Sequence, residues 1–213
     1  MSFAALRRAL LERLARGESR AFARAELRGL PMDEASRMAR ARAMGFDVDT
    51  PMYHGTASRD IEEFLPRGGG EDSERTLNWY RSRVAANEPI GGMNFRSGSF
   101  FSPDAEFANN YTAENTGVVY PVFLRTRNPL SFESSSRKWS LQNQGQSADA
   151  LVITDSGKVN EVAVIEPSNV RSRFAAFDPS RSNRRDILAG LAIAAPVGGL
   201  TLRELLQDRM GQT

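Results

Sequence analysis

The stretch Pro51-Met52-Tyr53-His54-Gly55-Thr56 marks the point where the chain changes from helical to strand-type sequence. It predicts a short strand that ends at a glycine, and it contains the single histidine of the chain. A lone histidine is often a structural residue, satisfied by one hydrogen bond. Gly55, however, allows a ligand to come close to the backbone, so that N–H and C=O groups become available to it. A structural and a functional interpretation of His54 therefore both stay open.

A second informative stretch is Ser99-Phe100-Phe101-Ser102. It predicts a short strand, in which neighbouring side chains point to opposite faces. One of the two phenylalanines therefore faces away from the main core or into a cleft. We expect Phe101 to lie in the core, together with Phe107 further along the chain.

A helix is expected directly after this strand. Ser102 is a suitable N-cap, Pro103 suits the first helical position, and Asp104 is an acid in the first turn. The helix is expected to run to about Tyr111. If Phe100 and Tyr111 meet across the turn between strand and helix, their rings can hold a flat heterocycle between them.

The third informative stretch is Asn160-Glu161-Val162-Ala163-Val164-Ile165. Together with the strand-type residues 150–154 and the turn residues 155–158, it predicts a β-hairpin over residues 150–165. An acid at the head of an apolar strand is often a solvated strand end. The functional alternative is that Glu161 stabilises a developing positive charge or accepts a hydrogen bond from a sugar hydroxyl.

The rest of the chain is expected to mix helices with short strands, so the predicted fold class is α+β. Helices are expected over residues 2–29 and 32–44, and a further helix around 74–86 inside a loop region, 66–98. The other predictions are a strand over 118–125 that is closed by Asn128-Pro129, a loop over 133–147, and a short helix or turn over 167–173.

The composition excludes several kinds of chemistry. The chain of 213 residues has no cysteine and one histidine, so disulfides, thiolate metal sites and multi-histidine zinc sites are excluded, and we expect no metal. A net charge of +2 does not by itself indicate a nucleic-acid partner. No run of about 18 apolar residues predicts a transmembrane helix. The first ten residues contain arginines and no long apolar signal region, which predicts a cytoplasmic protein.

The two ends of the chain differ from its middle. Residues 1–44 carry ten arginines and five acids, and their helix either packs on its own domain or a partner, or binds a membrane surface or nucleic acid. The apolar segment 187–200 is too short to span a bilayer, which favours a docking helix. We therefore divide the chain into a helical N-terminal segment (1–44), a central domain (45–180) and a C-terminal helical tail (181–213).

The order and spacing of the three stretches resemble the ADP-ribosyltransferase superfamily, on the diphtheria-toxin and poly(ADP-ribose)-polymerase side. Its signature is a His, a Tyr and a Glu on three separate strands. The matching motifs here are residues 53–56, residues 98–101 followed by Tyr111, and residues 160–164. The chain is particularly similar to ADP-ribosyltransferase-like domains of bacterial and phage polyvalent proteins, and the resemblance covers about residues 38–180. The shared stretches outside the three motifs are residues 42–47, 128–130 and 177–179.

This resemblance implies a split β half-barrel of two abutting sheets, preceded by helices, that holds NAD in a cleft. By position, His54 would hold a ribose hydroxyl of the adenosine half of NAD. The backbone of Gly55 would bind the carboxamide of the nicotinamide, and Thr56 would lie beside the adenosine ribose.

The other two motifs imply the chemistry. Phe100 and Tyr111 would stack on the two faces of the nicotinamide ring. Glu161 would bind the 2′-hydroxyl of the nicotinamide ribose and stabilise the oxocarbenium-like transition state, because a nearby carboxylate favours that state over the ground state. Three arginines in the loop between the first and second motifs are candidates to meet the pyrophosphate: Arg67, Arg75 and Arg81.

Three departures from the superfamily pattern bear on the reaction. Phe100 stands where relatives usually have tyrosine, so stacking is retained but a hydroxyl is lost. Ala108 replaces a serine that helps to bind the carboxamide in polymerase relatives, and Asn109 is a candidate to compensate. Val159, two residues before Glu161, stands where arginine-modifying toxins have Glu or Gln, which disfavours arginine as the acceptor.

The sequence therefore favours an NAD-dependent mono-ADP-ribosyltransferase that acts on a macromolecular acceptor, with protein preferred to nucleic acid. Such a protein would be encoded by a bacterium or phage, and delivery into a host cell is compatible with this origin. One alternative is a non-catalytic binding or structural module with a degenerate transferase fold. Another is an NAD glycohydrolase toxin. A serine hydrolase that uses His54 is disfavoured, because the sequence contains no Gly-x-Ser-x-Gly motif.

Overall fold

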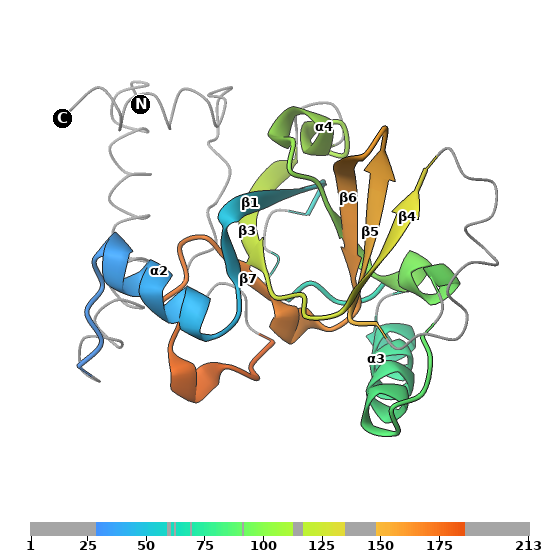
Figure 1. The fold of residues 1–213 in the computed structure, drawn as a ribbon, viewed down its shortest axis with the longest axis horizontal. Helices are drawn as coiled ribbons and strands as arrows, with labels where there is room; N and C mark the ends of the chain where they lie inside the picture. The colour runs from blue at the N-terminus through green and yellow to red at the C-terminus, as the bar shows by residue number, and fades with distance from the viewer. Residues whose placement is uncertain are drawn as a thin grey trace, which may run out of the picture.

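A computed structural model of the chain describes residues 29–185, apart from residues 59–60, 62, 69, 91, 113–116 and 135–147. Two β-sheets form its centre, with helices on either side, which confirms the α+β class (Figure 1). The first sheet has the strand order β1 (Asp47–Thr56), β3 (Val118–Leu124), β7 (Val170–Ser172). The second sheet has the order β2 (Ser99–Phe101), β6 (Lys158–Val164), β5 (Ala150–Asp155), β4 (Pro129–Glu133).

The second sheet contains the predicted hairpin. β5 and β6 pair in antiparallel fashion, and Ser156 and Gly157 between them have φ angles of 51° and 77°. Two consecutive positive φ angles are what a two-residue hairpin turn of type I′ requires. The parallel pairing of β4 with β5 was not predicted from the sequence. Pro129 marks the start of β4 rather than the end of a strand, because an edge strand tolerates proline at its first residue.

The first sheet is antiparallel throughout. Its third strand, β7, falls in the region that we expected to be a short helix or turn. The structure divides this region between a 3-10 helix, η2 (Pro167–Asn169), and β7, so the prediction was right for its first half only. β7 pairs with β3 and is buried along its whole length.

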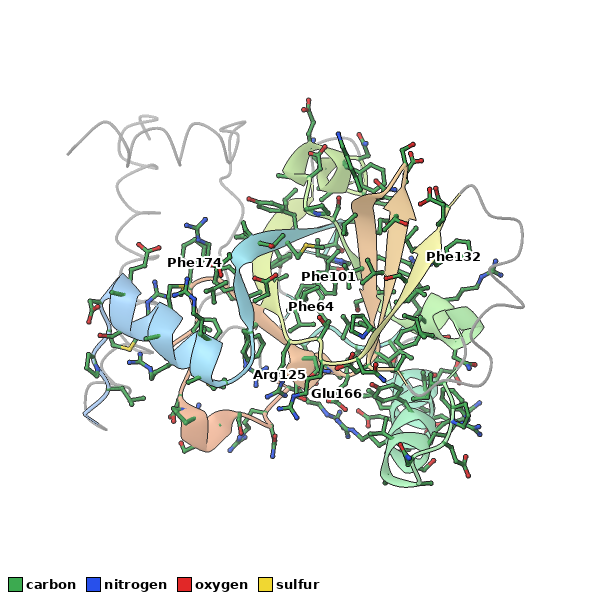
Figure 2. All side chains as sticks on the ribbon, in the orientation of Figure 1. Phe64, Phe101, Arg125, Phe132, Glu166 and Phe174 are labelled. Carbon is green, nitrogen blue, oxygen red and sulfur yellow. The ribbon has the colours of Figure 1, made fainter. Side chains whose placement is uncertain are left out.

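Within the described residues, the two sheets meet at a bridge between Tyr53 of β1 and Ser102 just after β2. Two backbone hydrogen bonds form it, of 2.7 Å from the Tyr53 N–H and 2.9 Å from the Ser102 N–H. The main hydrophobic core joins residues of both sheets, and Phe64 and Phe101 lie near its centre (Figure 2). Phe101 is 1% exposed, so its predicted place in the core is confirmed.

The first described helix, α2 (Glu34–Ala43), confirms the helix expected over 32–44. It begins at Asp33, whose carboxylate accepts the N–H of Ser36 at 2.8 Å, as an N-cap does. Its side chains also reach the segment directly after β7. Arg37 donates to the carbonyl oxygens of residues 173 and 175, and Arg40 donates to that of residue 176.

Two more helices cover the second sheet. α3 (Gly70–Ala85) and the 3-10 helix η1 (Gly92–Ser97) contribute Leu77 and Phe95 to an apolar cluster with β4, β5 and β6. α3 begins four residues before the helix that we predicted, and η1 lies in a region expected to be loop. A third 3-10 helix, η3 (Pro179–Arg181), follows β7 along the chain.

The short helix α4 (Ala105–Asn109) corrects one prediction about its start. Its N-cap is Asp104 and not Ser102, because the Asp104 carboxylate accepts the N–H groups of Glu106 and Phe107. The Ser102 hydroxyl instead accepts the N–H of Asp104, one step earlier along the chain. Serine and aspartate are both favoured at the N-cap, so residue type alone could not decide between Ser102 and Asp104.

Several expectations lie outside the described residues. These are all but the last residue of the helix expected over 2–29, the apolar segment 187–200 and most of the loop over 133–147. Within the described part of the chain, no helix has the length and apolar character needed to cross a membrane.

Candidate functional site

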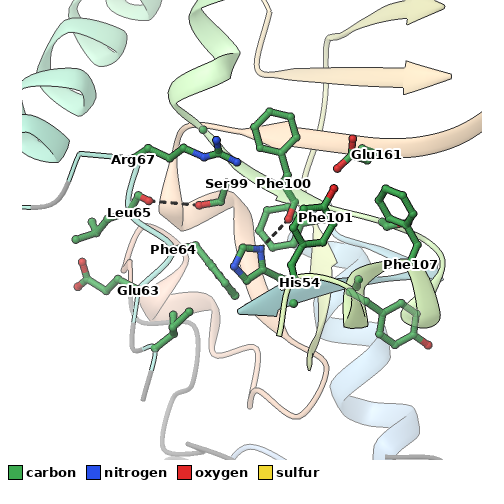
Figure 3. Close-up of a pocket in the computed structure, with 17 residues that line it drawn as sticks. His54, Glu63, Phe64, Leu65, Arg67, Ser99, Phe100, Phe101, Phe107 and Glu161 are labelled. Atoms are coloured by element: carbon green, nitrogen blue, oxygen red, sulfur yellow. Dashed lines mark hydrogen bonds between the residues drawn. The ribbon is translucent and has the colours of Figure 1, made fainter. Parts of the chain in front are cut away.

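A cavity of about 400 Å³ lies beside the bridge between the two sheets (Figure 3). Its walls come from β1, the segment 61–67, β2, α4 and β6. The resemblance assigns six residues to the NAD site, apart from the candidate arginines, and five of them line this cavity. The cavity thus brings together positions more than 100 residues apart along the chain. These five residues are His54, Gly55, Phe100, Tyr111 and Glu161.

His54 is fixed by a hydrogen bond of 2.7 Å between its Nδ1 and the carbonyl oxygen of Phe100. A carbonyl can only accept, so Nδ1 carries the proton and the neutral ring has its lone pair on Nε2. Burial, helped by the positive charge of Arg67, lowers the pKa of His54, although the hydrogen bond to Phe100 opposes this. The ring is therefore neutral near pH 7 and offers an acceptor atom.

Glu161 lies on β6 beside an irregularity in the strand pairing. Ile153 of β5 pairs with Glu161, but the next residue of β5 pairs with Val159, so Asn160 is an extra residue. Such bulges redirect neighbouring side chains and are frequent next to functional sites. Among the described residues, no side chain forms a hydrogen bond or ion pair with the Glu161 carboxylate.

The electrostatic setting of Glu161 differs from that of an exposed acid. Burial raises the pKa of Glu161, and the positive charge of Arg67 reduces this effect. A half-buried carboxylate without a protein partner is unfavourable for folding but is available to a ligand. Positive charge that develops in the cavity would therefore be stabilised strongly.

The aromatic residues are arranged partly as expected. Phe100 is half-buried, and Tyr111, just after α4, is 56% exposed at the cavity wall. The prediction that Phe107 lies in the core is wrong. Phe107 is half-buried, lines the cavity and contacts Tyr111 edge to face, with 5.7 Å between the ring centroids. A five-residue helix is too short for its sequence to show which face is buried.

The backbone at Gly55 is closely approached by another part of the protein, not only by the cavity. A Cβ atom at this position would lie 1.7 Å from the carbonyl oxygen of Ala108 in α4. Gly55 therefore lets α4 pack directly on β1, while it also lines the cavity. Thr56 is not among the lining residues, and its hydroxyl oxygen accepts the N–H of Ser58 at 3.1 Å.

The three arginines proposed to meet the pyrophosphate lie in different places. Arg67 lines the cavity, and its guanidinium lies over the Phe100 ring, 5.1 Å from the centroid. Arg75 forms an exposed ion pair with Asp72 one turn away on α3. Arg81 forms an ion pair of 2.7 Å with Glu166. Of the three, Arg67 is the one placed to meet a ligand in this cavity.

The lining residues between Ile61 and Leu65 were not found from the sequence. Phe64 contacts the His54 ring edge to face at 4.8 Å between centroids, and Glu63 is a second carboxylate at the cavity wall. They belong to an irregular segment without hydrophobic periodicity, and no pattern in the sequence indicates where such residues lie. Asn109, the suggested substitute for a serine, is exposed, and its side-chain oxygen lies 3.3 Å from the Thr112 hydroxyl as an acceptor. It does not line the cavity.

Among the described residues, no group of three or more His, Cys, Asp or Glu side chains is arranged to hold a metal ion. Comparison with known families gives one finding. A family model described as "ADP-Ribosyltransferase in polyvalent proteins" matches residues 49–179, which is more than half of the chain. No curated protein and no solved structure matches the chain significantly.

Proposed function

The chain belongs to the ADP-ribosyltransferases of polyvalent proteins, and we propose that it transfers ADP-ribose from NAD to a protein acceptor. One observation supports this most strongly. His54, Phe100, Tyr111 and Glu161 lie on three strands and beyond one helix, yet all line one cavity. We infer further that the two abutting sheets correspond to the split half-barrel of the wider superfamily.

The cavity suits the nicotinamide end of NAD. Phe100 and Tyr111 offer two aromatic faces to a planar, cationic ring, an arrangement that both stacking and cation–π attraction favour. The backbone of Gly55 binds the carboxamide beside them. His54 accepts a hydrogen bond from a ribose hydroxyl of the adenosine half through Nε2, and Thr56 lies nearby on the same strand.

Arg67 is assigned to the pyrophosphate. Its guanidinium forms no ion pair with a described carboxylate, so its donors remain available to phosphate oxygens. Binding there would also place the positive charge beside the Phe100 ring. The arginines at 75 and 81 are excluded from this role, because neither lines the cavity.

The reaction breaks the bond between nicotinamide and C1′ of its ribose. The bonding electrons leave with neutral nicotinamide, so positive charge develops on the sugar. Glu161 stabilises that charge and fixes the 2′-hydroxyl, an effect larger in the transition state than in the ground state. The acceptor then bonds to C1′ and releases its proton, which passes to water. Val159 is 45% exposed and apolar, so it offers no polar contact to an arginine acceptor.

Labelled NAD and a bacterial lysate provide the test, with wild type compared with Glu161→Gln and Glu106→Gln. Glu106 is an exposed carboxylate on α4 that does not line the cavity, so it is the matched control. We expect label on protein with wild type and with the control, and a loss of about 10²–10³-fold with Glu161→Gln.

The other outcomes separate the alternatives. Release of nicotinamide without labelled protein would show hydrolysis instead of transfer. Absence of both turnover and NAD binding, measured by calorimetry on the same sample, would show a module that is not catalytic.

A further inference from the structure

A second cavity, of about 380 Å³, lies between α3, the turn after β3 and η2, and shares no lining residue with the first. Arg125 and Glu166 lie close together in this region (Figure 2). Its polar side chains come from segments far apart in the sequence. The charged and phenolic ones are Tyr80, Arg81, Arg125, Arg127, Asp149 and Glu166.

The two acids in this cavity are already engaged with the protein. Both carboxylate oxygens of Glu166 accept from Arg81, at 2.7 and 2.8 Å. Both oxygens of Asp149 accept backbone N–H groups, those of Arg127 and Asn128. Neither acid therefore needs a further donor.

Several donors, in contrast, are not engaged. Arg125 uses Nε and Nη2 for Asn169 and Ser168, which leaves its Nη1 group without a hydrogen-bond partner among the described residues, and its guanidinium lies over the Phe46 ring at 5.3 Å from the centroid. Arg127 is exposed, and its guanidinium forms no ion pair with a described carboxylate, so its donors are hydrated and free to bind a ligand. Tyr80 is only 4% exposed, and its hydroxyl makes no hydrogen bond to a described residue. The Tyr80 oxygen is not sealed off from solvent, because it faces the cavity, where it can donate to a ligand.

The charges around this cavity also bear on which ligand it would bind. Burial and the nearby charge of Arg127 lower the pKa of Arg125, and the negative charges of Glu166 and Asp149 oppose this shift. The two guanidiniums therefore repel each other, and the carboxylates offset only part of that repulsion. Burial, together with the negative charges of Asp149 and Glu166, raises the pKa of Tyr80, which keeps its hydroxyl protonated and able to donate. An anion placed among these three side chains would relieve the repulsion and accept their hydrogen bonds.

We propose that this second cavity binds a phosphate group through Tyr80, Arg125 and Arg127. The donors come from a helix and from a turn, and converge from different directions. A phosphate group has three or more oxygens that can accept from such an arrangement, and the planar guanidinium matches pairs of them. A carboxylate has only two oxygens in one plane and fits a single guanidinium fork better.

Calorimetric titration of the full chain with inorganic phosphate, at constant ionic strength, tests this site. We expect saturable binding that Arg127→Gln weakens by about tenfold or more, because a charge-assisted hydrogen bond is lost. Tyr80→Phe should weaken phosphate binding severalfold but leave the unfolding midpoint without phosphate unchanged, because it removes no protein hydrogen bond. Arg42→Gln is the control, since Arg42 is an exposed arginine on α2 and the change in charge is the same.

The result that overturns the proposal is absence of saturable binding, or equal phosphate affinity in wild type and both cavity variants. Acetate that binds as tightly as phosphate would also overturn it. Ribose 5-phosphate identifies the source of the group. Tighter binding than inorganic phosphate would assign the site to a phosphorylated small molecule, and equal binding would assign it to free phosphate.

Discussion

His54 of the first sheet and Phe100 of the second are joined by a hydrogen bond of 2.7 Å from a side chain to a backbone carbonyl. β2 is the edge strand of the second sheet, and its bridge to β1 lies at Ser102, so the carbonyl of Phe100 needs a donor other than a ladder N–H group. Nδ1 provides that donor, while Nε2 remains available at the cavity. The structural and functional interpretations of the lone histidine are therefore compatible.

His54→Asn is predicted to separate these two roles. The asparagine N–H can replace Nδ1–H toward Phe100, but nothing replaces Nε2. We expect stability near that of wild type and NAD binding weakened about tenfold, whereas His54→Ala also lowers the free energy of unfolding by about 1–3 kcal/mol. Urea denaturation and calorimetric titration with NAD measure the two effects. Equal destabilisation by both substitutions would contradict the assignment.

Glu161→Gln is predicted to stabilise the protein while it slows transfer strongly. Because burial raises the pKa of Glu161 above its ordinary value of 4.5, the folded protein takes up this proton more readily than the unfolded chain. Its contribution to stability is therefore fully present below about pH 4.5 and is lost as the pH rises through the folded pKa. The variant should have a higher urea midpoint than wild type at neutral pH and an equal one at about pH 4. A variant less stable than wild type at neutral pH would refute this reasoning.

Arg67→Gln is predicted to weaken NAD binding about tenfold or more, since a charge-assisted contact to the pyrophosphate is lost. Arg75→Gln provides the matched control, because Arg75 lies on the exposed side of α3 in an ion pair that stabilises little. The dissociation constant for NAD, measured at two ionic strengths, should depend less on salt in the Arg67 variant. Similar affinities for the two variants would remove Arg67 from the site.

Gly55→Ala is predicted to damage both stability and activity. The added methyl group would overlap the Ala108 carbonyl, so α4 must move away from β1 and displace Tyr111 with it. We expect a loss of about 1–3 kcal/mol in the free energy of unfolding, typical of overpacking, together with weaker NAD binding. An unchanged urea midpoint would show that α4 adapts without strain.

The sequence predicted the parts of this site that depend on local pattern. Strand alternation separated Phe100 from Phe101, and the turn residues at 155–158 located the hairpin that holds Glu161. Contacts across the chain could not be read in this way. Phe64 contacts His54 from an irregular segment. Of the three candidate arginines, only the tertiary fold shows that Arg67 is the one at the cavity.

β7 was missed for a related reason. Its residues Arg171 and Ser172 are polar, so the sequence there does not read as a buried strand. The structure buries them because Arg171 donates to the carbonyl oxygens of residues 170, 181 and 182, among others. Burial of a charged residue that is matched in this way depends on tertiary contacts and has no signature in hydrophobic periodicity.

The bonds from Arg37 and Arg40 of α2 to residues 173–176 also have a consequence for synthesis of the protein. A ribosome that has added residue 165 has made every described strand of the second sheet and every residue of the first cavity. At that moment, however, β3 lacks β7 and α2 lacks its carbonyl partners. We therefore expect the nascent chain to stay incompletely folded, and open to chaperones and proteases, until residues near 176 have left the exit tunnel.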